Sequence, residues 1–161
     1  MRMILLGNAG AGKSTFARKL IRKEPAVHLS LDQIAFAQGT NRRPLAEGIA
    51  EPEVFIEANE SWIIEGCYAD IFEPLLSYCE KLIFLNPGVE SCVSHCKARP
   101  WEPEKFESKE AQDKNLENLI EWVRSYENRN DEYGLKRHRA LYEAFSGQKY
   151  ELNDPSDYTA V

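Results

Sequence analysis

Short apolar runs alternate along the chain with segments whose apolar residues have helical spacing. The runs predict strands over residues 3–6, 27–29, 62–66, 81–85 and 150–152. The intervening segments predict helices over residues 13–23, 70–79 and 89–97, through 116–126, and up to about 146. Strands that alternate with helices pair in parallel and are joined by right-handed crossovers. The pattern therefore predicts an α/β fold in which helices flank a five-stranded parallel sheet.

Single residues set three of the predicted helix boundaries. Pro52 is expected in the first turn of a short helix, where proline is tolerated because its missing N–H group is not needed. Asp70 is expected to cap the next helix, with Glu73 as its capping-box partner. Gly147 is expected at the C′ position after the last helix.

Two segments fit this layered pattern poorly, residues 33–60 and residues 99–113. Both contain prolines and charged residues but little clear periodicity. Loops of this length in a compact domain usually form lids or binding loops. Because the chain has no internal repeat and no linker-like stretch, we expect a single domain over residues 1–161.

A glycine-rich stretch, GNAGAGKST at residues 7–15, joins the first strand to the first helix. Gly7, Gly12, Lys13 and Ser14 satisfy the pattern G-x-x-x-x-G-K-[ST] in the strand–loop–helix context that the P-loop requires. Glycines let the backbone N–H groups face inward around phosphate oxygens, and the following helix adds its positive end. The alternative is a glycine-rich turn that merely precedes a helix. The ordered motif favours binding of a nucleoside triphosphate.

The P-loop residues have separate expected roles. The residues expected to contact the nucleotide are Gly7, Asn8, Ala9, Gly10, Ala11, Gly12, Lys13, Ser14 and Thr15. Lys13 is expected to contact the β- and γ-phosphates, and the Ser14 hydroxyl to bind Mg²⁺. The expected cofactors are therefore ATP and Mg²⁺.

Composition narrows the class of protein. The 161 residues include 20 Lys and Arg against 26 Asp and Glu, for a net charge of −6. This balance argues against non-specific binding to nucleic acid or to a membrane surface, although a local basic groove stays open. No apolar run approaches the roughly 18 residues of a membrane span. The first strand begins at residue 3, which leaves no room for a signal peptide, so we expect a cytoplasmic protein.

The four cysteines are expected to be core thiols. Cys92 and Cys96 flank His95, but Val89, Cys92, Val93 and Cys96 follow the spacing of a buried helical stripe. No C-x-x-C pair or second histidine completes a zinc set. A buried free cysteine behaves as a small apolar residue.

The chain resembles small P-loop kinases, among them adenylate, shikimate, gluconate and polynucleotide kinases. The resemblance is carried by the stretch at residues 7–15 and by WIIEG at 62–66 followed by Tyr68. The second segment is similar to the W-I-[IV]-[DE]-G-x-Y segment of adenylate kinase-related proteins labelled DNA topology modulation proteins. The likeness spans nearly the whole chain, and its most specific part is the P-loop.

The resemblance implies a three-layer P-loop NTPase fold with sheet order 2-3-1-4-5. It implies that residues 33–60 form an acceptor-binding flap and residues 99–113 a lid. The third strand is not followed by the glycine–aromatic–proline–arginine run of nucleoside monophosphate kinases, nor by the triple glycine of shikimate kinases. The acceptor therefore cannot be inherited from either family.

Two carboxylates are candidates for the metal or the acceptor. Asp32 follows the second strand and Glu65 lies near the end of the third, on the edge of a parallel sheet where ligands gather. Asp32 could activate an acceptor hydroxyl or hold a Mg²⁺ ligand, or it could be a helix N-cap. Glu65 could serve the metal, or it could be a surface charge at a strand end.

Arginines are candidates for stabilising the transferring phosphoryl group. Arg99 opens the expected lid and is the first candidate; Arg124 and then Arg129 follow it. Arg42 and Arg43 in the expected flap could bind an anionic acceptor. For each arginine the alternative is a solvated surface charge.

The leading hypothesis is a Mg²⁺·ATP-dependent kinase with Lys13, Asp32, Arg99 and Arg124 as catalytic residues and Ser14, Asp32 and Glu65 at the metal. Its partner would be a small hydroxyl or phosphate acceptor, and the chain would be a monomer or homodimer. One alternative is a nucleotide-binding regulator that turns ATP over slowly or not at all. Another is a nucleic-acid end kinase or DNA-associated protein. Such a protein would need a basic groove, which the net charge of −6 does not indicate.

Overall fold

The computed structural model describes residues 1–36, 42–103 and 106–159 and contains one parallel sheet. Its strands are β1 (Arg2–Gly7), β2 (Val27–Ser30), β3 (Trp62–Gly66), β4 (Lys81–Leu85) and β5 (Gln148–Leu152). The strand order is β2-β3-β1-β4-β5, and each neighbouring pair is parallel. Both the fold class and the order 2-3-1-4-5 are confirmed.

Helices cover both faces of the sheet. They are α1 (Lys13–Lys23), α2 (Asp32–Ala35), α3 (Leu45–Ala58), α4 (Ala69–Leu75), α5 (Val89–Lys97), α6 (Lys109–Arg124) and α7 (Leu135–Ala144), with short 3₁₀ helices η1 (Leu76–Tyr78) and η2 (Pro155–Thr159). Side chains alternate along β1, so Ile4 and Leu6 pack in the core with α4 and α7. Met3 and Leu5 pack in the other core, with α1, α5 and α6.

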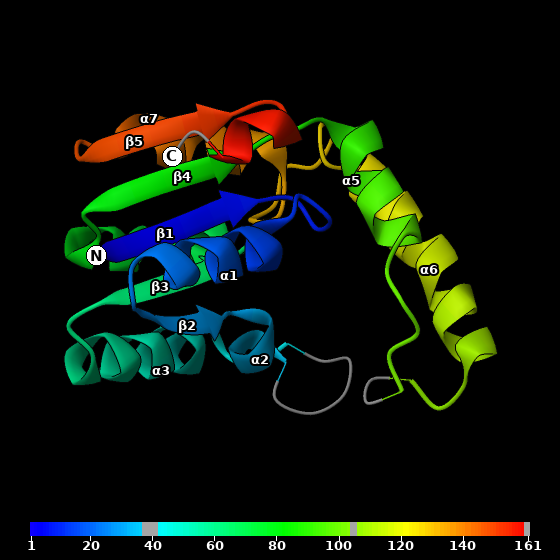
Figure 1. Cartoon of the computed structure of the whole chain (residues 1–161), viewed down its shortest axis with the longest axis horizontal. Helices are drawn as coiled ribbons and strands as arrows, with labels where there is room; N and C mark the ends of the chain where they lie inside the picture. Colours follow the sequence, from blue (N-terminus) through cyan, green and yellow to red (C-terminus); the bar gives the residue numbers. More distant parts are fainter. Residues whose placement is uncertain (37–41, 104–105, 160–161) are drawn as a thin grey trace.

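The parallel register brings the ends of the strands to one edge. Leu6 pairs with Gly66, Gly7 with Leu85, and Ser30 with Glu65. The P-loop and the segments that follow β2, β3 and β4 therefore leave the sheet on the same side. Figure 1 shows α5 and α6 standing side by side beyond this edge, at the points of the strand arrows.

The boundary predicted from Pro52 is wrong. Helix α3 begins at Leu45, directly after Pro44, and Pro52 lies inside it. An interior proline crowds the residue four positions earlier and removes a hydrogen bond to it. That residue is Gly48, which has no side chain. A Cβ at this position would lie 3.2 Å from the Ile71 side chain of α4. The missing side chain at Gly48 leaves room both for the proline ring and for packing on α4.

The capping predictions for Asp70 and Gly147 are also wrong. The N-cap of α4 is Tyr68, and Asp70 is the second helical residue, whose Oδ1 accepts a hydrogen bond from the Ile71 amide at 2.9 Å. Helix α7 ends at Ala144, and its C-cap, Phe145, is extended. A Cβ on Gly147 would lie 2.5 Å from the Phe145 ring, so this glycine allows a close ring contact instead of ending a helix.

The two segments with little periodicity are only partly irregular. Helices α2 and α3 take up much of residues 33–60, and residues 37–41 lie outside the described residues. Helix α6 begins at Lys109 within residues 99–113, where the Ser108 hydroxyl accepts a hydrogen bond from the Ala111 amide at 3.0 Å. Residues 104–105 lie outside the described residues.

The cysteines are free thiols. Cys92, Val93 and Cys96 are buried on one face of α5, as the spacing predicts. Burial raises the pKa of Cys79 to about 12 and that of Cys92 to about 11, so both remain protonated at neutral pH. In residues 1–36, 42–103 and 106–159 there is no group of three His, Cys, Asp or Glu side chains that could hold a metal. Within the same ranges, no helix has the length and apolarity needed to cross a bilayer.

A buried histidine joins α7 to the end of β3. His138 is fully buried; its Nε2 donates a hydrogen bond to the Cys67 carbonyl at 2.8 Å, and its Nδ1 accepts one from the Tyr126 hydroxyl at 2.7 Å. Its ring meets that of Phe84 edge-on. Burial lowers the pKa of His138 to about 4, so the imidazole is neutral in the folded protein at neutral pH.

Acid should therefore destabilise the fold through His138. The unfolded chain binds a proton at this residue near pH 6.5 and the folded chain near pH 4, so stability falls as the pH drops between these values. We expect a loss of about 2 kcal/mol between pH 7 and pH 5 from this one group. Urea unfolding of the wild type and His138→Gln at both pH values measures it. An equal pH dependence in the two proteins would contradict the assignment.

Candidate functional site

The P-loop takes a conformation that its glycines permit. Gly10 and Gly12 have φ values of 80° and 92°, in the left-handed region that side chains disfavour. The Ala11 amide donates a hydrogen bond to the Asn8 carbonyl at 3.1 Å, which closes the turn. Gly12 immediately precedes α1, so the loop ends at the positive end of a long helix.

The same glycines let other backbone approach closely. A Cβ on Gly7 would lie 2.5 Å from the carbonyl oxygen of Leu85 in β4. A Cβ on Gly10 would collide with the carbonyl oxygen of Cys92 in α5. The loop is therefore packed tightly against β4 and α5, and no larger residue fits at either position.

Three hydrogen bonds connect the P-loop to distant elements. His95 Nδ1 in α5 lies 2.6 Å from the Gly10 carbonyl oxygen, and the Tyr158 hydroxyl in η2 donates to the Ala11 carbonyl at 2.7 Å. The Asn8 side-chain amide donates to the Val123 carbonyl in α6 at 3.2 Å. Because a peptide unit is planar and trans, turning the Ala11 carbonyl toward Tyr158 points the Gly12 N–H group the opposite way. These contacts fix which N–H groups the loop presents.

Lys13 and Ser14 begin α1, as the motif predicts. Lys13 is buried, and its Nζ donates a hydrogen bond to the Asn8 carbonyl of the loop at 2.6 Å. The Ser14 hydroxyl donates to Glu65 Oε1 at 2.8 Å. The lysine, the serine and the carboxylate at the end of β3 therefore lie together at the base of the P-loop.

Glu65 is a buried ion, so the alternative interpretation, a surface charge at a strand end, is wrong. Its side chain is only 3% exposed, and His28 Nε2 lies 3.5 Å from Oε1. Burial by itself raises the pKa of Glu65, but His28, the charge of Lys13 and the hydroxyls of Ser14 and Ser30 together lower it to about 2. A permanently ionised carboxylate beside the Ser14 hydroxyl suits a hard cation such as Mg²⁺.

Asp32 is not a helix N-cap. It is the first residue of α2, whose N-cap is Leu31, and its exposed side chain accepts a hydrogen bond from the Tyr68 hydroxyl at 2.5 Å. The charges of Lys13, Asp32 and Glu65 all act on the pKa of the buried Cys67 thiol. The three charged side chains therefore lie near the same part of the sheet edge. The parallel register thus brings the two candidate carboxylates to the same side of the P-loop.

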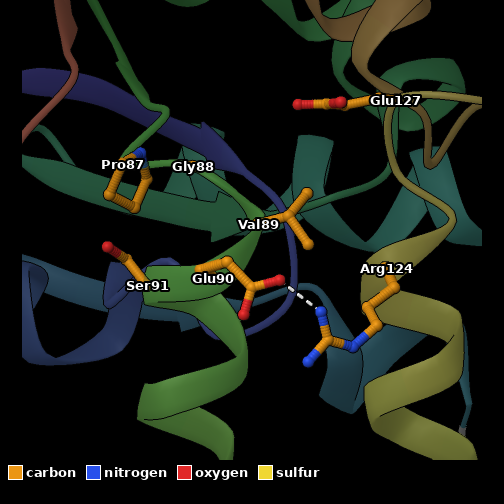
Figure 2. Close-up of a pocket in the computed structure, with 7 residues that line it drawn as sticks. All are labelled: Pro87, Gly88, Val89, Glu90, Ser91, Arg124 and Glu127. Carbon is orange, nitrogen blue, oxygen red and sulfur yellow. Dashed lines mark hydrogen bonds and ion pairs between the residues drawn. The ribbon is translucent and has the colours of Figure 1, made fainter.

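The structure does not bring Arg99 or Arg124 to that side. Arg99 is exposed just beyond the end of α5. Arg124 is exposed on α6 and forms an ion pair with Glu90 at the start of α5. Figure 2 shows this pair beside a hollow of about 470 Å³, lined also by Glu127 and by the loop that follows β4. In this conformation both arginines are exposed surface charges, which is the alternative given for them in the sequence analysis.

Arg42 and Arg129 instead belong to a set of side chains at the ends of β2 and β3. This arginine–carboxylate cluster, joined by hydrogen bonds and ring contacts, consists of Asp32, Arg42, Tyr68, Asp70, Trp122, Arg129, Asp131, Glu132 and Tyr133. Arg43 lies outside the cluster and pairs with Glu47 and Glu51 of α3. The cluster connects the expected flap with the turn after α6.

Sequence reasoning missed several of these residues. His95, Tyr158 and His28 contact the P-loop or Glu65, but none belongs to a motif. Asp70, Asp131 and Glu132 pair with the arginines, but Asp70 was expected only as a helix cap and the other two were not candidates. A weak signal existed for His95, since it lies on α5 between two buried cysteines. The partners of the others depend on tertiary contacts that no local spacing encodes.

Comparisons with known proteins agree with this architecture. Residues 3–73, which hold β1 to β3 and the P-loop, match a family model described as an AAA domain. The structure of deoxyadenosine kinase from M. mycoides with bound dATP is similar, with a TM-score of 0.52 and 13% sequence identity, over 95% of this chain and 91% of that one. A search of curated proteins finds no match. The chain therefore has the fold of the P-loop kinases.

The His95 contact predicts a difference between two variants. His95→Asn keeps an N–H donor near the position of Nδ1, whereas His95→Gln moves the donor outward by one bond. We expect His95→Asn to bind Mg²⁺·ATP as the wild type does, and His95→Gln to bind it about 5-fold more weakly, the scale of one hydrogen bond. Isothermal calorimetry measures both affinities. Equal affinities in the two variants would rule out this role for His95.

Proposed function

We propose that the protein is a Mg²⁺·ATP-dependent kinase that transfers the γ-phosphoryl group to a small acceptor. The observation that carries this proposal is the arrangement at the base of the P-loop. There Lys13 and Ser14 lie beside Glu65, whose carboxylate is buried and ionised. This combination of a cation, a hydroxyl and a carboxylate is what a nucleotide with its metal requires.

The residues present fit a triphosphate and a magnesium ion. The positive-φ glycines Gly10 and Gly12 let the loop backbone turn so that its N–H groups can face phosphate oxygens. Lys13 would release the Asn8 carbonyl and contact the β- and γ-phosphates. Ser14 and Glu65 would hold Mg²⁺, directly or through its water ligands, since Mg²⁺ is commonly bound by one or two carboxylates together with substrate phosphates. The metal would neutralise part of the charge of the phosphates.

The two carboxylates take different roles in this proposal. Glu65 is buried and bonded to Ser14, so it serves the metal. Asp32 is exposed at the end of β2 and bonded to Tyr68, so it is free to approach an acceptor. Asp32 accepts the proton of the attacking hydroxyl, as a general base must. Arg99 and Arg124 could act only after a movement of α5 and α6, which the proposal does not need.

The comparisons support a kinase without naming its acceptor. The matched family model covers residues 3–73, which include the P-loop, and the similar solved structure is that of a deoxyadenosine kinase. At 13% identity that similarity concerns the fold. The acceptor must therefore be argued from the residues of this chain.

Loss of the P-loop lysine tests nucleotide binding. Lys13→Ala should abolish the rise in melting temperature that Mg²⁺·ATP produces in the wild type, because the variant lacks the cation at the phosphates. Lys19→Ala, an exposed lysine on the same helix, is the matched control and should retain the rise. A full ATP-induced shift in Lys13→Ala would contradict the proposed phosphate site.

Removal of the Asp32 charge tests the chemistry. Asp32→Asn keeps the size of the side chain and a possible partner for Tyr68. Transfer to an acceptor should fall at least about 100-fold, while ATP affinity and melting temperature stay near wild type. Asp157→Asn in η2 is an exposed control. Full activity in a folded Asp32→Asn protein would show that another group accepts the proton.

A further inference from the structure

The arginine–carboxylate cluster bears on what the acceptor can be. It lies at the ends of β2 and β3, on the side of the P-loop where Asp32 and Glu65 are found. On the β4 side the loop contacts α5 through Gly10, whereas Asp32 follows β2 on the other side of the loop. Ligands of open parallel sheets bind outside the carboxyl ends of the strands. An acceptor that reaches Asp32 therefore passes this cluster.

The guanidinium group of Arg42 is paired with two carboxylates. It donates to Glu132 Oε1 at 2.5 Å and to Asp70 Oδ1 at 2.9 Å. Its planar group also lies over the rings of Tyr68 and Tyr133, with its central carbon 5.3 and 5.6 Å from their centres. Two carboxylates thus face one cation. Arg42 offers no excess positive charge to an anionic acceptor.

Arg129 is engaged in the same way. Its Nε and one terminal nitrogen donate to the Asp131 carboxylate at 3.0 and 2.6 Å, and the other terminal nitrogen donates to the Ser125 hydroxyl at 3.2 Å. The group lies over the Trp122 ring, 4.8 Å from its centre. Such a bidentate, stacked arginine is held in one orientation. The charge of Arg129 is therefore also neutralised, by Asp131.

Asp32 adds a carboxylate with no cation of its own. Its hydrogen bond comes from the neutral Tyr68 hydroxyl, and among the described residues no lysine or arginine forms an ion pair with it. The cluster as a whole has four carboxylates, Asp32, Asp70, Asp131 and Glu132, against two guanidinium groups.

We propose that the acceptor is a hydroxyl compound without a phosphate group, either uncharged or cationic, whose flat or apolar part contacts the rings of the cluster. This inference rests on the proposed kinase function. A phosphorylated acceptor would bring about two negative charges to a cluster whose described carboxylates outnumber its arginines, both of which are paired. Binding of such groups elsewhere uses unpaired arginines.

The chemistry points the same way. A phosphate acceptor attacks with an oxygen that is already anionic and needs no base. A hydroxyl acceptor must lose a proton, and Asp32 is an exposed carboxylate placed to take it. The acceptor oxygen forms a bond to the γ-phosphorus, and the bond from that phosphorus to the β–γ bridging oxygen breaks. ADP leaves with the bond's electron pair, and the hydroxyl proton passes to Asp32.

Matched pairs of acceptors test the proposal. We would measure transfer of label from γ-labelled ATP with Mg²⁺ to adenosine and AMP, thymidine and its 5′-monophosphate, ribose and ribose 5-phosphate, and glucosamine and its 6-phosphate. Transfer to unphosphorylated members, at least about 10-fold faster than to their phosphorylated partners, is expected. Equal or faster transfer to a phosphorylated member would overturn the inference and leave the kinase function standing. Binding of ATP without transfer to any compound would overturn the kinase function and the inference with it.

Charge variants show whether the cluster sets this preference. Glu132→Gln removes one carboxylate from Arg42, so the ratio of transfer to phosphorylated over unphosphorylated partners should rise at least about 10-fold. Asp131→Asn should raise the same ratio through Arg129 and serves if Glu132→Gln does not fold. Glu80→Gln, an exposed glutamate just before β4 at the opposite edge of the sheet, is the control and should leave the ratio unchanged. An unchanged ratio in the folded cluster variants would overturn the assignment.

Discussion

The structure depends on the close approach of the P-loop backbone to its neighbours. Gly7 lies against the Leu85 carbonyl of β4, and Gly10 against the Cys92 carbonyl of α5, at distances that exclude any Cβ. This contact fixes where α5 stands, and α6 packs beside α5 beyond the sheet edge (Figure 1). The P-loop is thus part of the core packing. A change in the position of α5 would therefore also displace the backbone of the P-loop.

The buried ion Glu65 depends on the same packing. Its carboxylate would be costly to bury alone, and the neighbours that lower its pKa come from different elements: Lys13 and Ser14 from α1, His28 and Ser30 from β2. The register Ser30 to Glu65 brings β2 into this arrangement. As the pH falls from about 4.5 toward 2, protonation of Glu65 would remove this part of the stability, because its folded pKa lies below its unfolded value.

Much of the fold could be predicted because its signals are local. The bounds of β3, β4, α1 and α5 follow from apolar runs, helical spacing and the P-loop motif, and the observed elements match them. The start of α3 could not be predicted from the local sequence, because Pro52 lies inside the helix. The residue four positions earlier is Gly48, which packs on α4. Lys13 and Ser14 were predicted from the P-loop motif, and Asp32 and Glu65 from their positions near the ends of parallel strands. The pairing of Arg42 with Glu132, 90 residues away, could not be predicted because no local sequence pattern indicates it.

That pairing divides the site by charge. At the P-loop, backbone N–H groups, a helix end and Lys13 present positive potential to phosphates. At the ends of β2 and β3, Arg42 pairs with Asp70 and Glu132, and Arg129 pairs with Asp131. Within the part of the chain that the structure describes, no lysine or arginine forms an ion pair with Asp32. Since like charges repel, the proposed kinase would disfavour a second phosphate on this side and favour a triphosphate on the other. The division would therefore allow it to bind a highly charged donor and still select an acceptor without phosphate.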